Sequence, residues 1–203
     1  TLQLDSHHRF EKGWDSMAVQ WVKALQRKGH KKPLITAYLS SFNPDNDPEE
    51  RAEAPFRMYF DRFTPEGIVF FIPENIPNWK EEKLPVPARF YSAHFAFTLG
   101  KFCKEVPHDP NYYFHGEEIS IAARAYTHGY DLFHPHRLIA YHEYTRRGRV
   151  KQWDVDKDWG IRNTNTHKRN RILFGMEEGQ RDFGIYGFGK ERSLKDYEAY
   201  PVI

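Results

Sequence analysis

The sequence predicts a mixed α/β fold, in which helices alternate with short strands. Two stretches with helical periodicity, 13–30 and 116–129, are separated by short apolar runs of strand character such as 33–40 and 56–63. This alternation is typical of α/β or α+β layers. The chain has 203 residues, which is enough to bury a sizeable core.

The first part of the chain supplies a strand end, a helix and a second strand. Residues 2–4 are strand-like and end at Asp5. Between residues 13 and 30, apolar side chains recur with the i, i+3, i+4, i+7 spacing of one helical face, and a glycine at 29 closes the helix. A strand is expected over 33–40, and the acidic, proline-containing segment 43–50 is expected to be an exposed loop.

The middle of the chain predicts a hairpin followed by irregular structure. Residues 56–63 and 67–72 flank the turn Thr-Pro-Glu-Gly and should pair as antiparallel strands. Proline interrupts 73–87, which is therefore expected to be a loop. Residues 88–100 are expected to be mixed strand and loop, with a short helix ending near Lys104.

The last part of the chain contains the clearest helix. Residues 116–129 place apolar side chains on one face, and short strands are expected over 130–135 and 138–144. After residue 150 the sequence becomes basic, and 157–175 is expected to be helical.

Composition narrows the functional classes. Aromatic residues make up 16% of the chain and hydrophobic residues 39%, so aromatic faces are available for stacking on sugars or bases as well as for packing. A net charge of +2 does not by itself indicate nucleic-acid binding. The lone Cys103 excludes an internal disulfide and fits a cytoplasmic location. The longest apolar runs are far short of the ~20 residues that span a bilayer.

The residues Asp5 and His7 form an Asp-x-His pair at the end of a predicted strand. Residues i and i+2 of a strand point the same way, so both side chains can bind one cation, and His142 from a distant strand is a candidate third ligand. A carboxylate with imidazoles suits Mn²⁺ or a similar divalent ion. The alternatives are that Asp5 caps the next segment, that the histidines are solvated, and that His142 is a core residue.

Two acids, Glu117 and Glu118, follow Gly116 at the start of the 116–129 helix. Acids in the first turn commonly complement the helix dipole. Because neighbouring positions on a helix are about 100° apart, one acid can serve the helix while the other faces a cleft.

The C-terminal part has two further features. Residues 166–171 are basic, which fits a solvated helix face, a nucleic-acid contact or a segment over a diphosphate. Residues 183–189, Phe-Gly-Ile-Tyr-Gly-Phe-Gly, would suit a flexible lid.

Several of these motifs, taken in order, resemble one family. From Leu4 to about Tyr200 the sequence is similar to the cytoplasmic polypeptide α-N-acetylglucosaminyltransferases, and through them to the polypeptide N-acetylgalactosaminyltransferases. The motifs are LDSHHRFEKGWD, RFYSAHFAF, VPHDPNYYFHGEEISIAARAYTHGYDLFHP, YHEYTR and YGFGKERSLKDYEAY.

This resemblance implies roles for individual residues. Asp5, His7 and His142 match the positions that hold Mn²⁺ against the diphosphate of a UDP-sugar. Glu117 matches the catalytic-site acid beside the donor sugar, with Glu118 adjacent. The residues that match the family's donor-binding positions are Ser92, Ala93 and Arg9. As an alternative, Arg9 could make a salt bridge that fixes its loop.

The resemblance also implies a fold and a reaction. It implies a GT-A-like fold whose nucleotide-binding βαβ half is expected to be missing, since only four residues precede Asp5. Residues 1–150 would then be the metal- and substrate-binding part, and 151–203 an extension that packs on or over the active site. The implied reaction transfers N-acetylglucosamine or a related sugar from UDP to a polypeptide hydroxyl, with retention.

Two other functions remain open from the residues alone. An Asp/His/His triad also occurs in non-haem iron oxygenases, usually with the His-x-acid order. The aromatic surfaces also fit a non-catalytic module that binds carbohydrate or nucleic acid.

Overall fold

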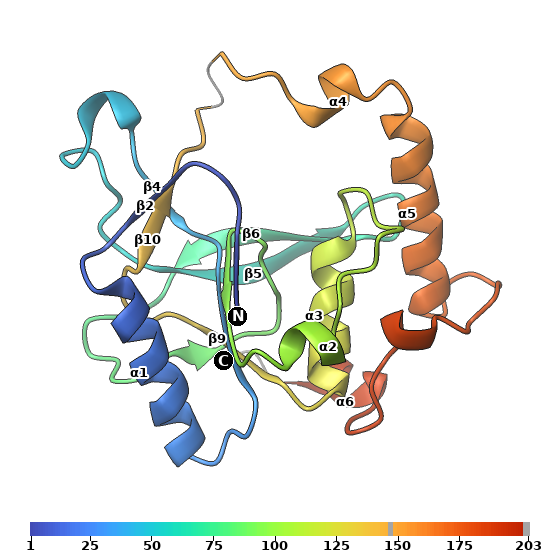
Figure 1. Ribbon diagram of the computed structural model, residues 1–203, viewed down its shortest axis with the longest axis horizontal. Coiled ribbons are helices and arrows are strands. Elements are labelled where there is room, and N and C mark those ends of the chain that lie inside the picture. The colour runs from blue at the N-terminus through green and yellow to red at the C-terminus, as the bar shows by residue number, and fades with distance from the viewer. Residues whose placement is uncertain (146–147, 201–203) are drawn as a thin grey trace.

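The computed structural model describes residues 1–145 and 148–200 and consists of three small sheets with helices around them (Figure 1). The largest sheet has five strands in the order β1-β8-β3-β9-β7. β3 is parallel to β9, and the other pairs are antiparallel. The strands are β1 (Leu2–Leu4), β8 (Phe95–Phe97), β3 (Pro33–Ala37), β9 (Asp131–His134) and β7 (Val86–Pro87).

Two smaller sheets complete the strands. In the three-stranded sheet, β10 (Ala140–His142) lies between β2 (His8–Phe10) and β4 (Ser40–Ser41), antiparallel to the first and parallel to the second. The hairpin of β5 (Phe56–Phe63) and β6 (Val69–Asn75) has a register shift after Phe60.

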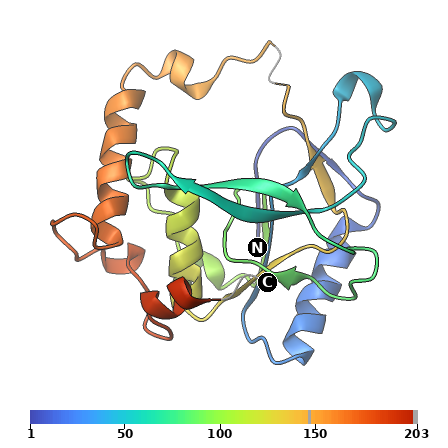
Figure 2. The same cartoon turned by 180° about the vertical axis from the view of Figure 1, so that it is seen from behind.

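Helices α1 (Trp14–Arg27) and α3 (Glu117–Thr127) cover opposite faces of the five-stranded sheet (Figures 1 and 2). Neighbouring residues of a strand face opposite sides, and in β3 Leu34 packs in the cluster of α3 while Ile35 packs in the cluster of α1. The helices are α1 (Trp14–Arg27), α2 (Phe102–Glu105), α3 (Glu117–Thr127), α4 (Gln152–Val155), α5 (Trp159–Leu173) and α6 (Leu194–Ala199), with 3₁₀ turns at Pro44–Asn46 and Gly184–Tyr186.

The mixed α/β prediction is confirmed, and the main differences lie at element ends. The strand expected over 33–40 divides into β3 and β4, because the chain leaves the large sheet after Ala37 and pairs with β10 instead. The segment 73–87 was expected to be a loop, but it holds the end of β6 and the short strand β7. Proline is tolerated in both places because neither strand lies inside a sheet.

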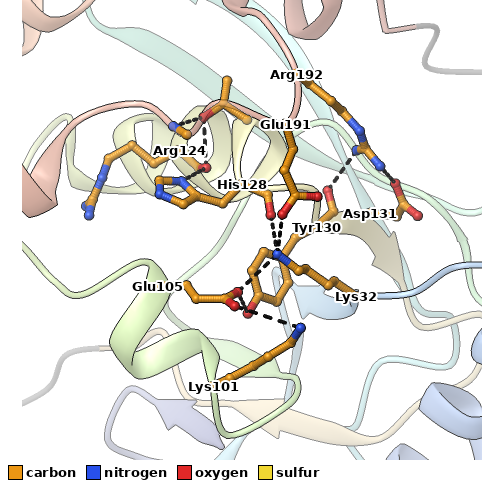
Figure 3. A network of polar contacts seen from close by, with 11 residues as sticks. Lys32, Lys101, Glu105, Arg124, His128, Tyr130, Asp131, Glu191 and Arg192 are labelled. Atoms are coloured by element: carbon orange, nitrogen blue, oxygen red, sulfur yellow. Dashed lines mark hydrogen bonds and ion pairs between the residues drawn. The ribbon is translucent and has the colours of Figure 1, made fainter.

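A polar network fixes residues 189–192 to the C-terminal end of α3 (Figure 3). The Lys32 ammonium donates to Glu191 at 2.6 Å and to the His128 carbonyl at 2.7 Å, and it lies 3.3 Å from Glu105. Arg192 donates to Asp131 at 2.7 Å. The segment predicted as a lid leads directly into this network, at the end of α3 opposite to Glu117 and Glu118.

His134 connects the hairpin to the large sheet. The buried imidazole accepts a hydrogen bond from Met58 N–H at 3.2 Å through Nε2, so Nδ1–H donates to the Thr36 carbonyl, 3.0 Å away. Both contacts require the neutral ring. Burial lowers the pKa of His134 to about 4.

We expect this histidine to make the fold sensitive to acid. The unfolded chain takes up the proton near pH 6.5, whereas folded His134 resists protonation down to about pH 4. Its contribution is therefore complete above pH 6.5 and is lost as the pH falls, by about 2 kcal/mol at pH 5. Urea unfolding of the wild type and of His134→Leu at pH 7.5 and pH 5 measures this. The variant should lose less stability between the two pH values, and an equal loss would contradict the prediction.

Candidate metal centre

Three side chains that are distant in sequence meet at one edge of the large sheet. Asp5, His94 and His142 each offer one ligand atom, and these atoms all lie within 4.8 Å of one another. The His142 Nε2 atom is 3.1 Å from the Asp5 carboxylate. Asp5 is about half exposed and His142 is buried, so the group opens to solvent on the carboxylate side.

The strand pairings explain why these residues meet. Asp5 follows β1 and His94 precedes β8, and the antiparallel register places Leu4 opposite Phe95. A residue just after one strand and a residue just before its antiparallel partner are neighbours, and Asp5 N–H donates to the His94 carbonyl at 3.4 Å. The last residue of β10, His142, reaches the same place from the second sheet.

Tyr144 fixes the tautomer of His94. Its hydroxyl donates to the Leu39 carbonyl at 2.5 Å, so it has no proton left for the imidazole. Burial raises the pKa of Tyr144, which keeps it protonated. The His94 Nδ1 atom, 3.3 Å from the hydroxyl oxygen, must then be the donor. In a neutral ring with this contact, the lone pair is on Nε2, the state that a metal ligand needs.

His142 is also suited to the neutral state. Its ring stacks on the His94 ring with centroids 4.6 Å apart and planes inclined by 4°, an arrangement that two imidazolium ions would oppose. Burial lowers the pKa of His142, although Asp5 acts in the other direction. Among the described residues, the buried Nδ1 of His142 has no hydrogen-bond partner.

The pKa of Asp5 favours the carboxylate. Burial alone would raise it, but the Ser6 N–H at 2.7 Å and the nearby His142 lower it below its usual value. One carboxylate and two neutral imidazoles form a donor set for Mn²⁺, Zn²⁺ or Fe²⁺. The residues present therefore fit a divalent cation.

His7 does not join this group. Residues 5–7 form a bend between β1 and β2, so the strand rule that places i and i+2 on one side does not apply. His7 has a φ of 72°, and its Nε2 lies 3.2 Å from Ser6 Oγ. Its ring centroid is 6.4 Å from that of His142. The structure thus brings Asp5 and His142 together, as the sequence predicted, with His94 in place of His7.

Ser92, Ala93 and Glu118 position the loop that carries His94. Ser92 N–H donates to the hydroxyl of Thr36 at 2.8 Å, and His94 N–H donates to the Ser92 hydroxyl at 3.3 Å. Ala93 N–H donates to the Glu118 carboxylate at 2.8 Å. Burial, with smaller effects from Glu117 and Asp5, raises the pKa of Glu118 to about 7.

The two acids at the start of α3 have different partners. Glu118 faces the 92–94 loop, whereas Glu117 lies 2.9 Å from His108 Nδ1 and is partly exposed. Neither side chain caps the helix, which starts after Gly116 with a φ of 101°. The two acids have different surroundings, as expected, but the expectation that one of them caps the helix is wrong.

Arg9 points away from the metal centre. Its guanidinium lies 3.6 Å from Asp47 and over the ring of Phe42, so it connects β2 with the 43–50 loop. This is the salt bridge that the sequence left open as an alternative to donor binding.

The comparison with protein families decides the class of the protein. A family model described as Glycosyltransferase (GlcNAc) matches residues 1–203, which is the whole chain. The chain belongs to this glycosyltransferase family. No curated protein matches the sequence.

Membership of the family indicates the general class of reaction. The glycosyltransferase acts on a sugar donor and an acceptor, and the Asp5, His94 and His142 group is the candidate place for their chemistry. Within residues 1–145 and 148–200, no helix is long and apolar enough to cross a membrane.

Sequence reasoning missed His94 and its partner Tyr144. His94 follows Ser92 and Ala93, which were singled out, and a lone imidazole in the aromatic run Phe-Tyr-Ser-Ala-His-Phe was a usable signal. What the sequence lacked was the β1–β8 register, which alone brings Asp5 beside His94.

Proposed function

We propose that this glycosyltransferase transfers N-acetylglucosamine, or a related sugar, from a UDP-sugar to a polypeptide hydroxyl with retention. The proposal includes a GT-A-like arrangement and a divalent cation, Mn²⁺ by its donor set, held by Asp5, His94 and His142. The observation that carries it is the convergence of these three side chains beside the acidic start of α3. Membership of the family favours sugar transfer over an iron oxygenase or a non-catalytic module.

The reaction explains why such a centre is useful. Negative charge grows on the diphosphate as the bond to the sugar breaks, and a bound divalent cation supplies Lewis-acid stabilisation of that charge. The protein's own part is to hold the ligand atoms in place before the reaction, so that little reorganisation is needed. Tyr144 and the Ser92–Glu118 contacts do this for His94.

Glu117 and Glu118 are proposed to have distinct roles in transfer. Glu117 is the more accessible acid, which supports a role in orienting the acceptor or the donor sugar. Glu118 is a positioning residue, because it acts on His94 through the Ala93 N–H. No close pair of carboxylates, as in retaining hydrolases, is required for a transfer in which the donor phosphate receives the acceptor's proton.

A donor and acceptor screen tests the function. The purified chain is incubated with UDP-N-acetylglucosamine, UDP-N-acetylgalactosamine or UDP-glucose and with peptides that contain serine, threonine or hydroxyproline. UDP release and peptide mass are measured with Mn²⁺ and with a chelator. We expect Mn²⁺-dependent addition of one hexosamine to one class of peptide. Transfer that is undiminished by the chelator would contradict the metal centre, and turnover that needs iron, oxygen and a 2-oxoacid would contradict sugar transfer.

The role of Glu118 predicts a difference between two substitutions. Glu118→Ala removes the acceptor for the Ala93 N–H and should weaken Mn²⁺ affinity about tenfold, a typical effect for residues that orient ligands. Glu118→Gln keeps a carbonyl acceptor and should change this affinity by less than about threefold. Titration calorimetry with Mn²⁺ measures both, with Glu117→Ala as the control. Equal losses in the two Glu118 variants would contradict the positioning role.

A further inference from the structure

A cavity of about 430 Å³ lies beside the C-terminal half of α1 and is lined by cations. Lys23 and Arg27 come from α1, Lys83 precedes β7, and Arg137 lies between β9 and β10. No acidic side chain is among the lining residues. Three separate segments of the chain therefore contribute positive charge to one cavity.

These four cations are not neutralised by the protein. Within the part of the chain that the structure describes, none of them makes a salt bridge, although most other arginines do, such as Arg51 with Asp47 and Arg192 with Asp131. The acids at 81 and 82 precede Lys83 in sequence but do not line the cavity. All four residues are exposed, so water screens part of their mutual repulsion, and an anion in the cavity would reduce what remains.

The helix end explains only part of this charge. A basic residue in the last turn of a helix is favourable, which accounts for Arg27. Lys83 and Arg137 belong to other segments, so a position in the last helical turn does not account for them. Lys23 and Arg27 are four residues apart on one helical face, where like charges are unfavourable.

A buried histidine forms the wall behind the cations. His136 is 1% exposed, lines the cavity and packs against Trp21 with ring centroids 5.3 Å apart and planes tilted by 55°. Among the described residues its Nδ1 atom has no hydrogen-bond partner. Buried polar atoms are usually paired, so the unpaired nitrogen makes His136 an unusual residue in the wall of this cavity.

We propose that this cavity binds a phosphate-bearing anion with more than one phosphate group. Arginine and lysine recognise phosphate oxygens by charge-assisted hydrogen bonds, and the volume is within the range of small-molecule sites. The site is separate from the metal centre, because α1 rises about 20 Å from its start near β2 to its C-terminal end. In Figure 1, α1 runs downwards from the sheet of β2, β4 and β10.

The test uses free anions and vesicles as separate probes. Inositol hexakisphosphate and pyrophosphate are titrated into the full chain by calorimetry, with a chelator present so that the metal centre does not take part. Phosphatidylcholine vesicles with and without phosphatidylinositol bisphosphate are tested by sedimentation. We expect hexakisphosphate binding that weakens as salt is added, because salt screens these charges. Vesicle binding in addition would identify a lipid headgroup as the source of the phosphates.

Matched double variants make the test specific. Arg27→Gln with Arg137→Gln removes two cavity cations and should weaken hexakisphosphate binding at least about tenfold. Lys28→Gln with Lys31→Gln removes the same charge from exposed positions outside the cavity and should change it less than about twofold. Thermal unfolding checks that both variants fold. No binding of any probe at low salt, or equal losses in the two variants, would overturn the proposal.

Discussion

Replacing His94 with alanine should lower the rate of sugar transfer about a hundredfold or more, whereas His7→Ala should change it by less than about threefold. His94 lies with Asp5 and His142 in a group whose ligand atoms are within 4.8 Å of one another, and His7 is outside it. A hundredfold loss corresponds to about 2.7 kcal/mol of transition-state stabilisation. Loss of one of three protein ligands should reach this size, because the charge on the leaving diphosphate is then stabilised less.

Two measurements separate this prediction from a general loss of structure. Mn²⁺ affinity and kcat/KM are measured for the wild type, His94→Ala and His7→Ala, and urea unfolding shows whether each variant is folded. Asp5→Asn and His142→Ala should behave like His94→Ala. If His7→Ala loses Mn²⁺ affinity and His94→Ala keeps it, the ligand set implied by the family resemblance is correct and the set assigned here is wrong.

The second large effect is expected at Gly189. A Cβ at this position would collide with the carbonyl of Thr127 and the backbone nitrogen of His128, which are main-chain atoms and cannot rotate away. The close approach of Gly189 to the end of α3 allows two hydrogen bonds. Gly189 N–H donates to the Thr127 hydroxyl at 2.9 Å, and Glu191 N–H donates to the Thr127 carbonyl at 3.0 Å. Gly189→Ala should therefore destabilise the protein by about 3 kcal/mol, the upper range for overpacking.

A second glycine provides the control for Gly189→Ala. Gly160 lies in the first turn of α5 with open space where a Cβ would be. Gly160→Ala should leave the stability unchanged or raise it by about 0.5 kcal/mol, since alanine is the better helix former. Unfolding free energies of both variants are measured in urea. A Gly189→Ala protein as stable as the wild type would mean that residues 189–192 are not fixed to the end of α3 as described.

Loss of the contact at Gly189 should also weaken the ion pairs of the Lys32 network. Glu191 follows two residues later and receives the Lys32 ammonium, while Arg192 bridges to Asp131 (Figure 3). These side chains are partly exposed, so each ion pair alone contributes little. The backbone contacts with Thr127 hold the segment in place, and the ion pairs add to a position that is already fixed.

The elements with strong local patterns could be predicted from the sequence. The apolar spacing from Trp14 to Leu25 produces α1, and the turn at 64–67 joins two β-rich runs into the β5–β6 hairpin. The sequence also indicated Asp5, which follows a predicted strand, and His142, which the family resemblance matches to a third metal ligand. Local periodicity determines the helix and the hairpin, and it depends only on neighbours within a few residues.

The tertiary structure alone showed which third side chain lies with Asp5 and His142. The pairing of β1 with β8 brings His94 beside Asp5, and the bend at 6–7 leaves the His7 ring centroid 6.4 Å from that of His142. The same holds for the cation-lined cavity, whose four charges come from three segments that have no common motif. Strand register and the packing of distant segments depend on contacts between residues far apart in the chain, and no local pattern in a single sequence encodes them.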